Sequence, residues 1–260
     1  MRILFVGDVV GRPGRDAVEG LLPVLRERHE VDVCVVNGEN VADGVGITPK
    51  LAERLLAAGA DAITLGNHTW RRQEIRPYLE SSDRIVRPAN FAATTPGKGL
   101  TVVPAADGTP VAVVNVMGSL SLQPATSMWE LVDDLVDEAR SATPVVVVDV
   151  HAEATSEKVA LARWLDGRVT AVIGTHTHVQ TSDARVQPGG TAAITDAGMT
   201  GPHDSVIGVK AEQATQRMRT GMTVRFEVAD GGVRIEGVLV GFDGATGRAS
   251  AITPVRVPWP

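Results

Sequence analysis

Five short apolar runs, each ending in side chains that can bind a metal ion, constrain the fold of this chain more than any other feature. The runs read ILFVGD, VCVVNGEN, AITLGNH, VVVVDVH and AVIGTHTH. Such runs are typical of buried parallel strands, and in open α/β sheets ligands bind beyond the carboxyl ends of the strands. We therefore expect one edge of the sheet to collect two carboxylates, two amides and four of the six histidines. These residues are Asp8, Glu39, Asn40, Asn67, His68, His151, His176 and His178.

The order of elements along the chain predicts an α/β architecture. Strands are expected at Arg2–Gly7, Asp32–Asn37, Asp61–Leu65, Leu100–Val103, Val111–Val116, Val145–Val150, Val169–Ile173, Thr191–Thr195, Met222–Val228 and Val233–Val240. Helices are expected at Asp16–Arg28, Pro49–Ala58, Arg71–Glu80, Met128–Arg140 and Thr155–Leu165. Alternating strands and helices imply parallel pairing, whereas the ADGG turn between the last two strands predicts a hairpin. Two mixed sheets with flanking helices accommodate both, and we interpret residues 1–260 as a single domain.

Local signals mark the ends of the first two helices. A turn at Gly11–Gly14 is expected before the first helix, and Pro23 should kink or shorten that helix. Thr48 is expected to cap the second helix, with Pro49 in the first helical position.

Charge and composition exclude several classes of partner. The net charge of −6 argues against duplex nucleic acid or an anionic membrane, but it permits a small anionic substrate, because bound cations dominate the local field of a site. No apolar stretch reaches the length of a membrane span, so a cytoplasmic location is expected. Cys34 is the only cysteine, which excludes a disulfide within the chain, and its apolar neighbours predict a buried thiol.

The residue types at the strand ends indicate a site for two metal ions. Carboxylate, amide and imidazole ligands suit Mn, Fe, Zn, Co or Ni, and the absence of cysteine among the candidate ligands excludes a structural zinc finger. In an extended chain, His176 and His178 would point the same way and reach two neighbouring ions. Glu39 is placed to bridge those ions. Two ions about 3.5–4 Å apart can hold a hydroxide and clamp a phosphoryl group, and His68 is the best candidate for the general acid.

The ordered motifs resemble those of the calcineurin-like metallophosphoesterases, and more closely those of their YmdB-like branch. The similar segments read FVGDVVGRPGR, VNGEN, TLGNHTW, RPANF, DVHAEATSEK, GTHTHVQT and TDAGMTGPHDSVIG, and they extend from Met1 to about Gly208. The resemblance implies a four-layer αββα sandwich of two mixed sheets with a dinuclear centre, usually of iron or manganese, with zinc as an alternative. It also implies hydrolysis of phosphodiesters, with 2′,3′-cyclic nucleotides as the characteristic substrate, and activity on phosphomonoesters.

The resemblance also assigns ligands to the two ions. One ion would be held by Asp8, Glu39 and His178. The other would be held by Glu39, Asn67, His151 and His176. The chain departs from the wider superfamily at two positions. Val10 stands where the first motif usually has a histidine, so Asn40 is expected to supply a replacement oxygen, and Thr69 stands where an acidic residue usually follows the general acid.

Other interpretations remain open. Arg12 follows Asp8 closely and could bind a substrate phosphate, although a surface role is slightly favoured. An amidohydrolase-type barrel also uses an H-x-H pair, but it would place that pair on an early strand. A regulatory protein that binds nucleotide or a partner on the same metallo-fold, with weak phosphatase activity, is the main functional alternative. Assembly as a homo-oligomer is a further possibility that the sequence leaves open.

Overall fold

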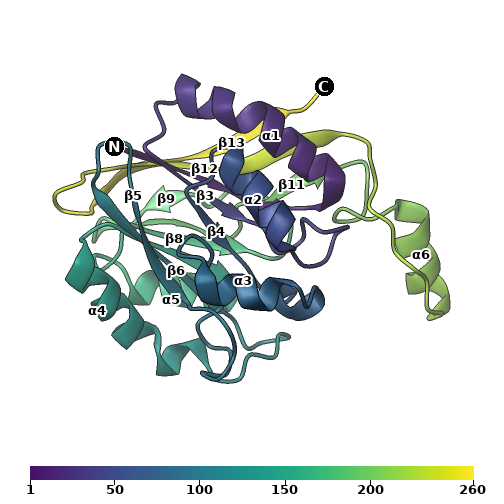
Figure 1. Ribbon diagram of the computed structural model, residues 1–260, viewed down its shortest axis with the longest axis horizontal. Helices are drawn as coiled ribbons and strands as arrows, with labels where there is room; N and C mark the ends of the chain where they lie inside the picture. Colours follow the sequence, from purple (N-terminus) through teal and green to yellow (C-terminus); the bar gives the residue numbers. More distant parts are fainter.

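Two mixed β-sheets packed face to face organise the chain, which the computed structural model describes over residues 1–260 (Figure 1). The first sheet has the order β2-β11-β12-β1-β3-β4, with β13 also paired to β12, and the second has the order β5-β6-β7-β8-β10-β9. The first sheet contains β1 (Arg2–Val6), β2 (Asp8–Val9), β3 (Val33–Asn37), β4 (Ala62–Thr64), β11 (Met199–Pro202), β12 (Val233–Phe242) and β13 (Ala249–Pro258). The second contains β5 (Leu100–Pro104), β6 (Pro110–Met117), β7 (Val146–His151), β8 (Ala171–Thr175), β9 (Arg185–Val186) and β10 (Ala192–Ile194).

Helices cover the outer face of each sheet, so the expected four-layer αββα sandwich is confirmed (Figure 1). The α-helices are α1 (Gly11–Arg28), α2 (Pro49–Ala57), α3 (Ile75–Ser81), α4 (Val132–Ala142), α5 (Thr155–Trp164) and α6 (Ala211–Thr220). Helices α1, α2 and α3 pack on the first sheet, and α4 and α5 pack on the second. No helix combines the length and the apolar character that crossing a membrane requires.

Three apolar cores hold the layers together, and strand periodicity explains how one strand serves two of them. On β1, Leu4 and Val6 face the helices while Ile3 and Phe5 face the second sheet, because successive side chains of a strand point to opposite faces. Both faces are buried, which is why the run is apolar throughout. The core between the sheets draws residues from both of them. This shared core supports the interpretation of residues 1–260 as one domain, which stays a prediction.

Parallel pairing at the centre of each sheet brings the carboxyl ends of the strands to one edge. Strand β3 pairs in parallel with both β1 and β4, and β7 does so with both β6 and β8. After β1, Gly7 lets the chain pass close to the backbone of Gly198, where an added Cβ would lie 2.1 Å from a carbonyl oxygen. The chain then continues as β2, which pairs with β11 and begins at Asp8.

The helix boundaries differ from expectation in three places. The residues expected to form a turn, Gly11–Gly14, are instead the first turn of α1, and Pro23 does not shorten this helix, which continues to Arg28. The helix expected at Arg71–Glu80 is divided into a 3₁₀ turn, Thr69–Arg71, and α3. Likewise, Met128–Glu130 is a separate 3₁₀ turn before α4.

Other local predictions are confirmed. The hydroxyl of Thr48 accepts the amide of Leu51 and caps α2, with Pro49 in its first turn. Cys34 is fully buried, and its burial raises the pKa of the thiol.

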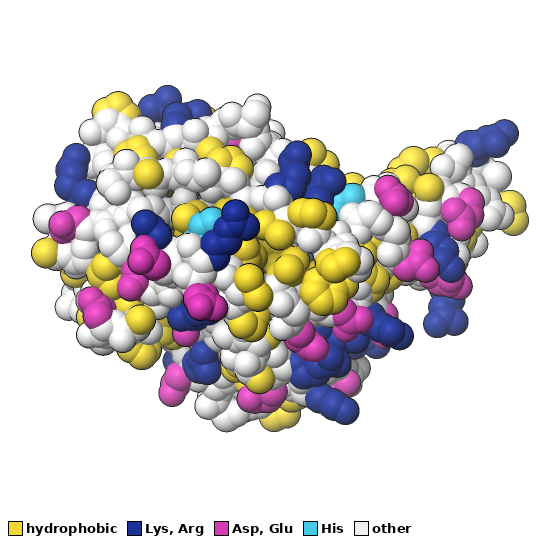
Figure 2. Space-filling model, turned by 90° about the horizontal axis from the view of Figure 1, so that it is seen from above, with side chains coloured by type: hydrophobic (Ala, Val, Ile, Leu, Met, Phe, Trp, Pro, Cys, Tyr) yellow, Lys and Arg dark blue, Asp and Glu magenta, His cyan; other side chains and the backbone are white.

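The predicted hairpin of Met222–Val228 with Val233–Val240 is wrong. Strand β12 pairs instead with β1 and β11 along one edge and with β13 along the other, so both of its edges are occupied. Of the predicted partner strand, only Val228 forms a bridge, and it does so with Val209. Residues 211–228 instead form an arm of α6 and a returning segment, which projects to one side of the molecule (Figures 1 and 2). Met218 on this arm is 79% exposed.

Candidate metal centre

The side chains predicted as metal ligands and the predicted general acid lie in one hydrogen-bonded cluster at the carboxyl ends of the strands. The first sheet supplies Asp8 from β2, Glu39 and Asn40 after β3, and Asn67 and His68 after β4. The second sheet supplies His151 at the end of β7 and His176 and His178 after β8. The cluster therefore spans the junction between the two sheets.

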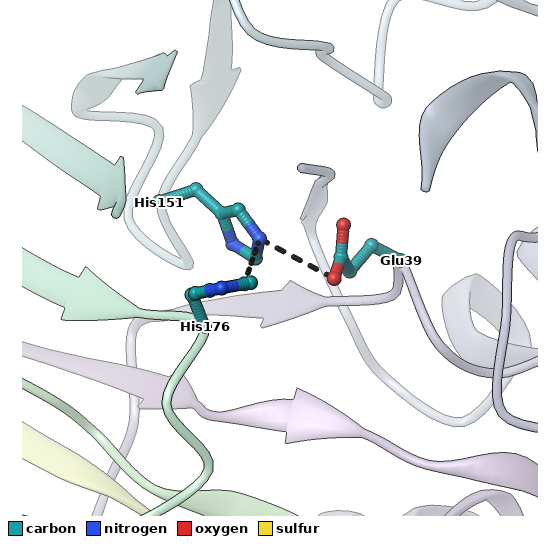
Figure 3. A group of neighbouring side chains, drawn as sticks. All are labelled: Glu39, His151 and His176. Atoms are coloured by element: carbon teal, nitrogen blue, oxygen red, sulfur yellow. Dashed lines mark hydrogen bonds and ion pairs between the residues drawn. The ribbon is translucent and has the colours of Figure 1, made fainter. Parts of the chain in front are cut away.

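One half of the cluster gathers around the Nε2 atom of His151. This atom lies 3.3 Å from Oε1 of Glu39, 2.9 Å from Oδ1 of Asn67 and 3.1 Å from Nδ1 of His176. Figure 3 shows both histidine rings and the carboxylate directed toward one point. The ligand atoms of Glu39, His151 and His176 all lie within 4.8 Å of one another. A single proton on one nitrogen cannot serve so many acceptors, whereas a divalent cation can bind them all.

The other half gathers around Asp8, whose burial is complete. Its Oδ2 accepts the amide of His176 at 3.1 Å, but its Oδ1 is buried without a hydrogen-bond partner. Nε2 of His178 lies 3.9 Å from Oδ1. An unpaired buried carboxylate oxygen is unfavourable, and a cation beside it would satisfy it. The chemistry of these residues thus fits a cation site, while the number of ions and the individual ligand roles stay predictions.

A hydroxyl fixes the orientation of the His151 ring. Oγ1 of Thr175 donates its only proton to Oδ1 of Asp149 at 2.7 Å, so it must accept the proton of Nδ1 of His151 at 2.9 Å. The lone pair of Nε2 then faces the cluster. Oδ2 of Asp149 in turn accepts from the amide of Asn37 at 3.1 Å, which connects the two sheets directly.

The other two imidazoles are held in the same way. Nε2 of His176 lies 3.1 Å from the carboxylate of Glu153, which leaves Nδ1 directed at the cluster. Nδ1 of His178 donates to the carbonyl of Ile207 at 2.9 Å, which leaves Nε2 directed at the cluster. An outer acceptor of this kind selects the tautomer of a metal-binding histidine and raises its basicity.

The H-x-H segment is not extended, contrary to expectation. His176 has a φ of +97° and His178 a φ of +65°, and such left-handed conformations cost about 1–3 kcal/mol each for residues other than glycine. The two rings reach different halves of the cluster because the chain turns between them. From Thr175 to Gln180 the sequence carries no glycine or asparagine that would have revealed this turn.

The electrostatics of the cluster favour positive charge. Burial opposes protonation of His151, but the carboxylates of Glu39, Asp8 and Asp149 raise its pKa to about 9. Burial likewise opposes ionisation of Glu39, yet His151 and His68 hold its pKa well below the usual value. Burial and the neighbouring His151 lower the pKa of His176 to about 3. Positive charge is thus stabilised at His151, whereas burial raises the pKa of Asp8 and opposes its ionisation.

His68 is held through only one side of its ring. Its Nδ1 lies 2.6 Å from Oδ1 of Asn40, and its backbone amide donates to Oε2 of Glu39 at 3.0 Å. Nε2 forms no hydrogen bond within the chain, so it is free to face a substrate. The amide of Asn40 presents its nitrogen, not its oxygen, to His178 at 3.1 Å. A role for Asn40 as a metal ligand therefore requires the amide to rotate by half a turn.

Arg12 is separate from the cluster. It lies in the first turn of α1, its side chain is 80% exposed, and its Nε pairs with Asp16 at 3.2 Å. It borders a groove of about 1090 Å³ whose lining contains none of the clustered residues. This placement favours the surface role, and the phosphate-binding role stays a prediction.

Several residues that support the site were not recognised from the sequence. They are Asn37, Gly66, Asp149, Glu153, Lys158, Thr175, Thr177 and Asp196. One signal was available for Asp149, because it precedes His151 by two residues on a strand and so shares its face. At Gly66, an added Cβ would lie 2.3 Å from Nε2 of His151 and 2.4 Å from Oε2 of Glu39, so a larger residue would displace the cluster.

Comparisons with known proteins show the family and agree with the fold. The family model described as YmdB-like protein matches residues 4–255. The chain is 48% identical to a 2′,3′-cyclic-nucleotide 2′-phosphodiesterase of Bacillus subtilis strain 168, over 99% of this chain and 97% of that protein. A hypothetical protein from Thermus thermophilus has a similar structure, with a TM-score of 0.93, 43% identity and full coverage of both chains. A novel phosphatase from Mycoplasma pneumoniae superposes with a TM-score of 0.91 at 33% identity, covering 99% of this chain and 93% of that one.

Proposed function

Because the chain belongs to the YmdB-like protein family, we propose that it is a metal-dependent hydrolase of phosphodiesters and that 2′,3′-cyclic nucleotides are its substrates. The observation that carries this proposal is the cluster itself. Two buried carboxylates, Asp8 and Glu39, lie among the imidazoles of the cluster, and Oδ1 of Asp8 lacks a hydrogen-bond partner. The family membership and the identity to the Bacillus enzyme support the substrate class.

The clustered residues would hold two cations, for which iron and manganese are the proposed metals and zinc the alternative. Asp8, Glu39 and His178 form one set, and Glu39, Asn67, His151 and His176 form the other, so Glu39 belongs to both. When bound, such cations neutralise the phosphoryl oxygens and make water a nucleophile at neutral pH. Imidazole and carboxylate ligands permit several first-row metals, so the metal must be found by elemental analysis.

The proton for the leaving oxygen is assigned to His68. Attack of water on phosphorus breaks one P–O bond of the cyclic diester and leaves a monoester and a ribose hydroxyl. That hydroxyl needs a proton, and the unengaged Nε2 of His68 is the nitrogen able to supply it. Asn40 binds the opposite ring nitrogen at 2.6 Å, and Glu39 binds the backbone amide, so both residues orient the ring. Position 69 holds a threonine in place of the usual acidic residue. Thr69 is fully buried and its hydroxyl donates to the carbonyl of Gly66, so this position does not orient His68.

The departure at Val10 favours a second candidate, a regulatory nucleotide-binding protein on the same fold. Val10 is 2% exposed, and its side chain packs against Gly201 and Gly208, so the position contributes no imidazole to the cluster. In this case nucleotide would bind with little or no turnover. Calorimetry with a nucleotide and the metal-loaded protein separates binding from hydrolysis.

Hydrolysis assays with purified protein test the proposal. Protein loaded with Mn²⁺ or Fe²⁺ should hydrolyse bis-p-nitrophenyl phosphate and 2′,3′-cyclic AMP, and chelation should abolish both reactions. The variant Glu39→Gln should lose both activity and bound metal. Glu236→Gln is the matched control, because Glu236 is also buried but pairs with Arg234 and Arg256. Full activity of Glu39→Gln, or activity in the presence of excess chelator, would contradict the proposal.

A further inference from the structure

Thr177, between the two histidines of the H-x-H segment, is held by a buried carboxylate on another strand connection. Its backbone amide donates to Oδ2 of Asp196 at 3.0 Å, and its hydroxyl donates to the same oxygen at 2.7 Å. Asp196 follows β10, the next strand in the second sheet. A two-point contact of this kind fixes both the backbone and the side chain of the residue that separates His176 from His178.

Both oxygens of the Asp196 carboxylate accept hydrogen bonds, and one of them also forms an ion pair. Its Oδ2 also binds Nζ of Lys158 at 2.9 Å, and its Oδ1 accepts the amide of Gly198 at 2.9 Å. Asp196 is 1% exposed and Lys158 is 3% exposed. Withdrawing such a pair from water is unfavourable unless its geometry and hydrogen bonds are well satisfied, so a buried pair is weak evidence for stability alone. The role of this pair is therefore better inferred from its position beside the H-x-H segment than from its burial.

The segment that Asp196 holds has two residues in left-handed backbone conformations, at His176 and His178. Without an external constraint such residues relax toward commoner conformations. Relaxation would turn both rings, because each imidazole is attached to a strained residue. The outer acceptors Glu153 and Ile207 each hold only one ring. Asp196 is the contact placed between them, where it acts on both.

We infer that Lys158, Asp196 and Thr177 form a clamp that positions His176 and His178 so that each directs one nitrogen into a different half of the metal cluster. Asp196 and Thr177 are positioning residues, and Lys158 neutralises the carboxylate that does the holding. This inference rests on the proposed function, because it assumes that the cluster binds two cations. It predicts that weakening the clamp lowers affinity for both cations together, whereas removing a single ligand mainly affects one.

Calorimetric titration of Mn²⁺ into chelator-stripped protein measures the effect without relying on activity. Thr177→Val removes the hydroxyl while keeping the shape, and Thr177→Ser restores it. Supporting groups of a metal site typically contribute about 10–100-fold in affinity, so Thr177→Val should weaken both binding steps about tenfold or more. Thr177→Ser should return both steps to within about twofold of wild type. Asp166→Ala is the control. Asp166 accepts the amide of Gly189 just before β10, at the end of that strand opposite to Asp196.

The melting temperature of the metal-free proteins separates an effect on the position of the histidines from an effect on the stability of the fold. Thr177→Val should melt no lower than the control, yet bind Mn²⁺ more weakly. If both steps keep wild-type affinity, or if only one weakens, the clamp is refuted. The variant Glu39→Gln distinguishes failure of the clamp from failure of the proposed metal site. If Glu39→Gln loses Mn²⁺ while Thr177→Val does not, only the clamp is wrong, whereas full binding by Glu39→Gln would overturn the metal site itself.

Discussion

Replacing Gly66 by alanine should damage the metal centre while leaving the fold intact. An added Cβ would lie 2.3 Å from Nε2 of His151 and 2.4 Å from Oε2 of Glu39. An ordinary contact begins at about 3.4 Å, so one or both of these groups must move by about 1 Å. Gly66 does not have a left-handed φ, so the alanine backbone itself is unstrained.

The expected loss follows from the size of this displacement. A misplacement of about 1 Å in an active site can reduce the rate about 10²-fold, which corresponds to about 2.7 kcal/mol of transition-state stabilisation. We therefore expect kcat/KM for bis-p-nitrophenyl phosphate to fall about 100-fold in Gly66→Ala at saturating Mn²⁺. Affinity for Mn²⁺ should fall as well, because both displaced atoms are proposed ligands.

The control for this experiment is Gly241→Ala. At Gly241 the nearest neighbour of an added Cβ is Oγ of Ser250 at 3.0 Å, and no strained backbone is involved. This variant should keep kcat/KM within about threefold of wild type, since it lies on β12 away from the cluster. Equal activity of Gly66→Ala and wild type would refute the argument that the cluster has no room at this position.

Four further outcomes are expected. Phe5→Ala, in the core between the sheets, should reduce the free energy of unfolding by about 3–5 kcal/mol, measured by urea denaturation, and a loss under about 1 kcal/mol would contradict the packing described. Thr175→Val should weaken Mn²⁺ binding about 10–100-fold by releasing the His151 ring, with Thr175→Ser as the rescue. Cation at about 100 times its dissociation constant should stabilise the protein by about 2.7 kcal/mol, so chelation should lower the melting temperature, and an unchanged temperature would count against a bound cation. Although burial opposes it, hydrogen bonds from Thr181 and Thr195 lower the pKa of Asp183, so stability should fall as pH drops below about 4, and Asp183→Asn should flatten this acid limb of the unfolding curve.

The sequence carried the information for the parallel strands and the residues at their ends, because both depend on patterns only a few residues long. The apolar run before Asp8 and the one before Glu39 identified buried strands, and the geometry of parallel sheets then brought their ends together. The resemblance of the ordered motifs added a grouping of the ligands into two sets, which stays a prediction. These predictions needed no knowledge of which distant segments meet.

Contacts between distant segments account for what was missed. Strand β12 pairs with β1 and β11 along one edge and with β13 along the other, and a local turn signal at ADGG could not reveal these distant partners. The clamp on Thr177 joins residues from α5 and from the connection after β10, and no spacing rule links them. The left-handed conformations of His176 and His178 were hidden because residues other than glycine seldom adopt them and no local signal marks the ones that do.

The division of the cluster between two sheets makes it sensitive to how they are aligned. Glu39 belongs to a loop of the first sheet and His151 to a strand of the second, and only the apolar core and a few polar contacts such as Asn37 with Asp149 keep them in register. A substitution deep in that core could let the layers slide by a fraction of an ångström without unfolding the protein. Catalytic rate would then decline while the protein stays folded, so enzyme activity would report how well the two sheets are aligned.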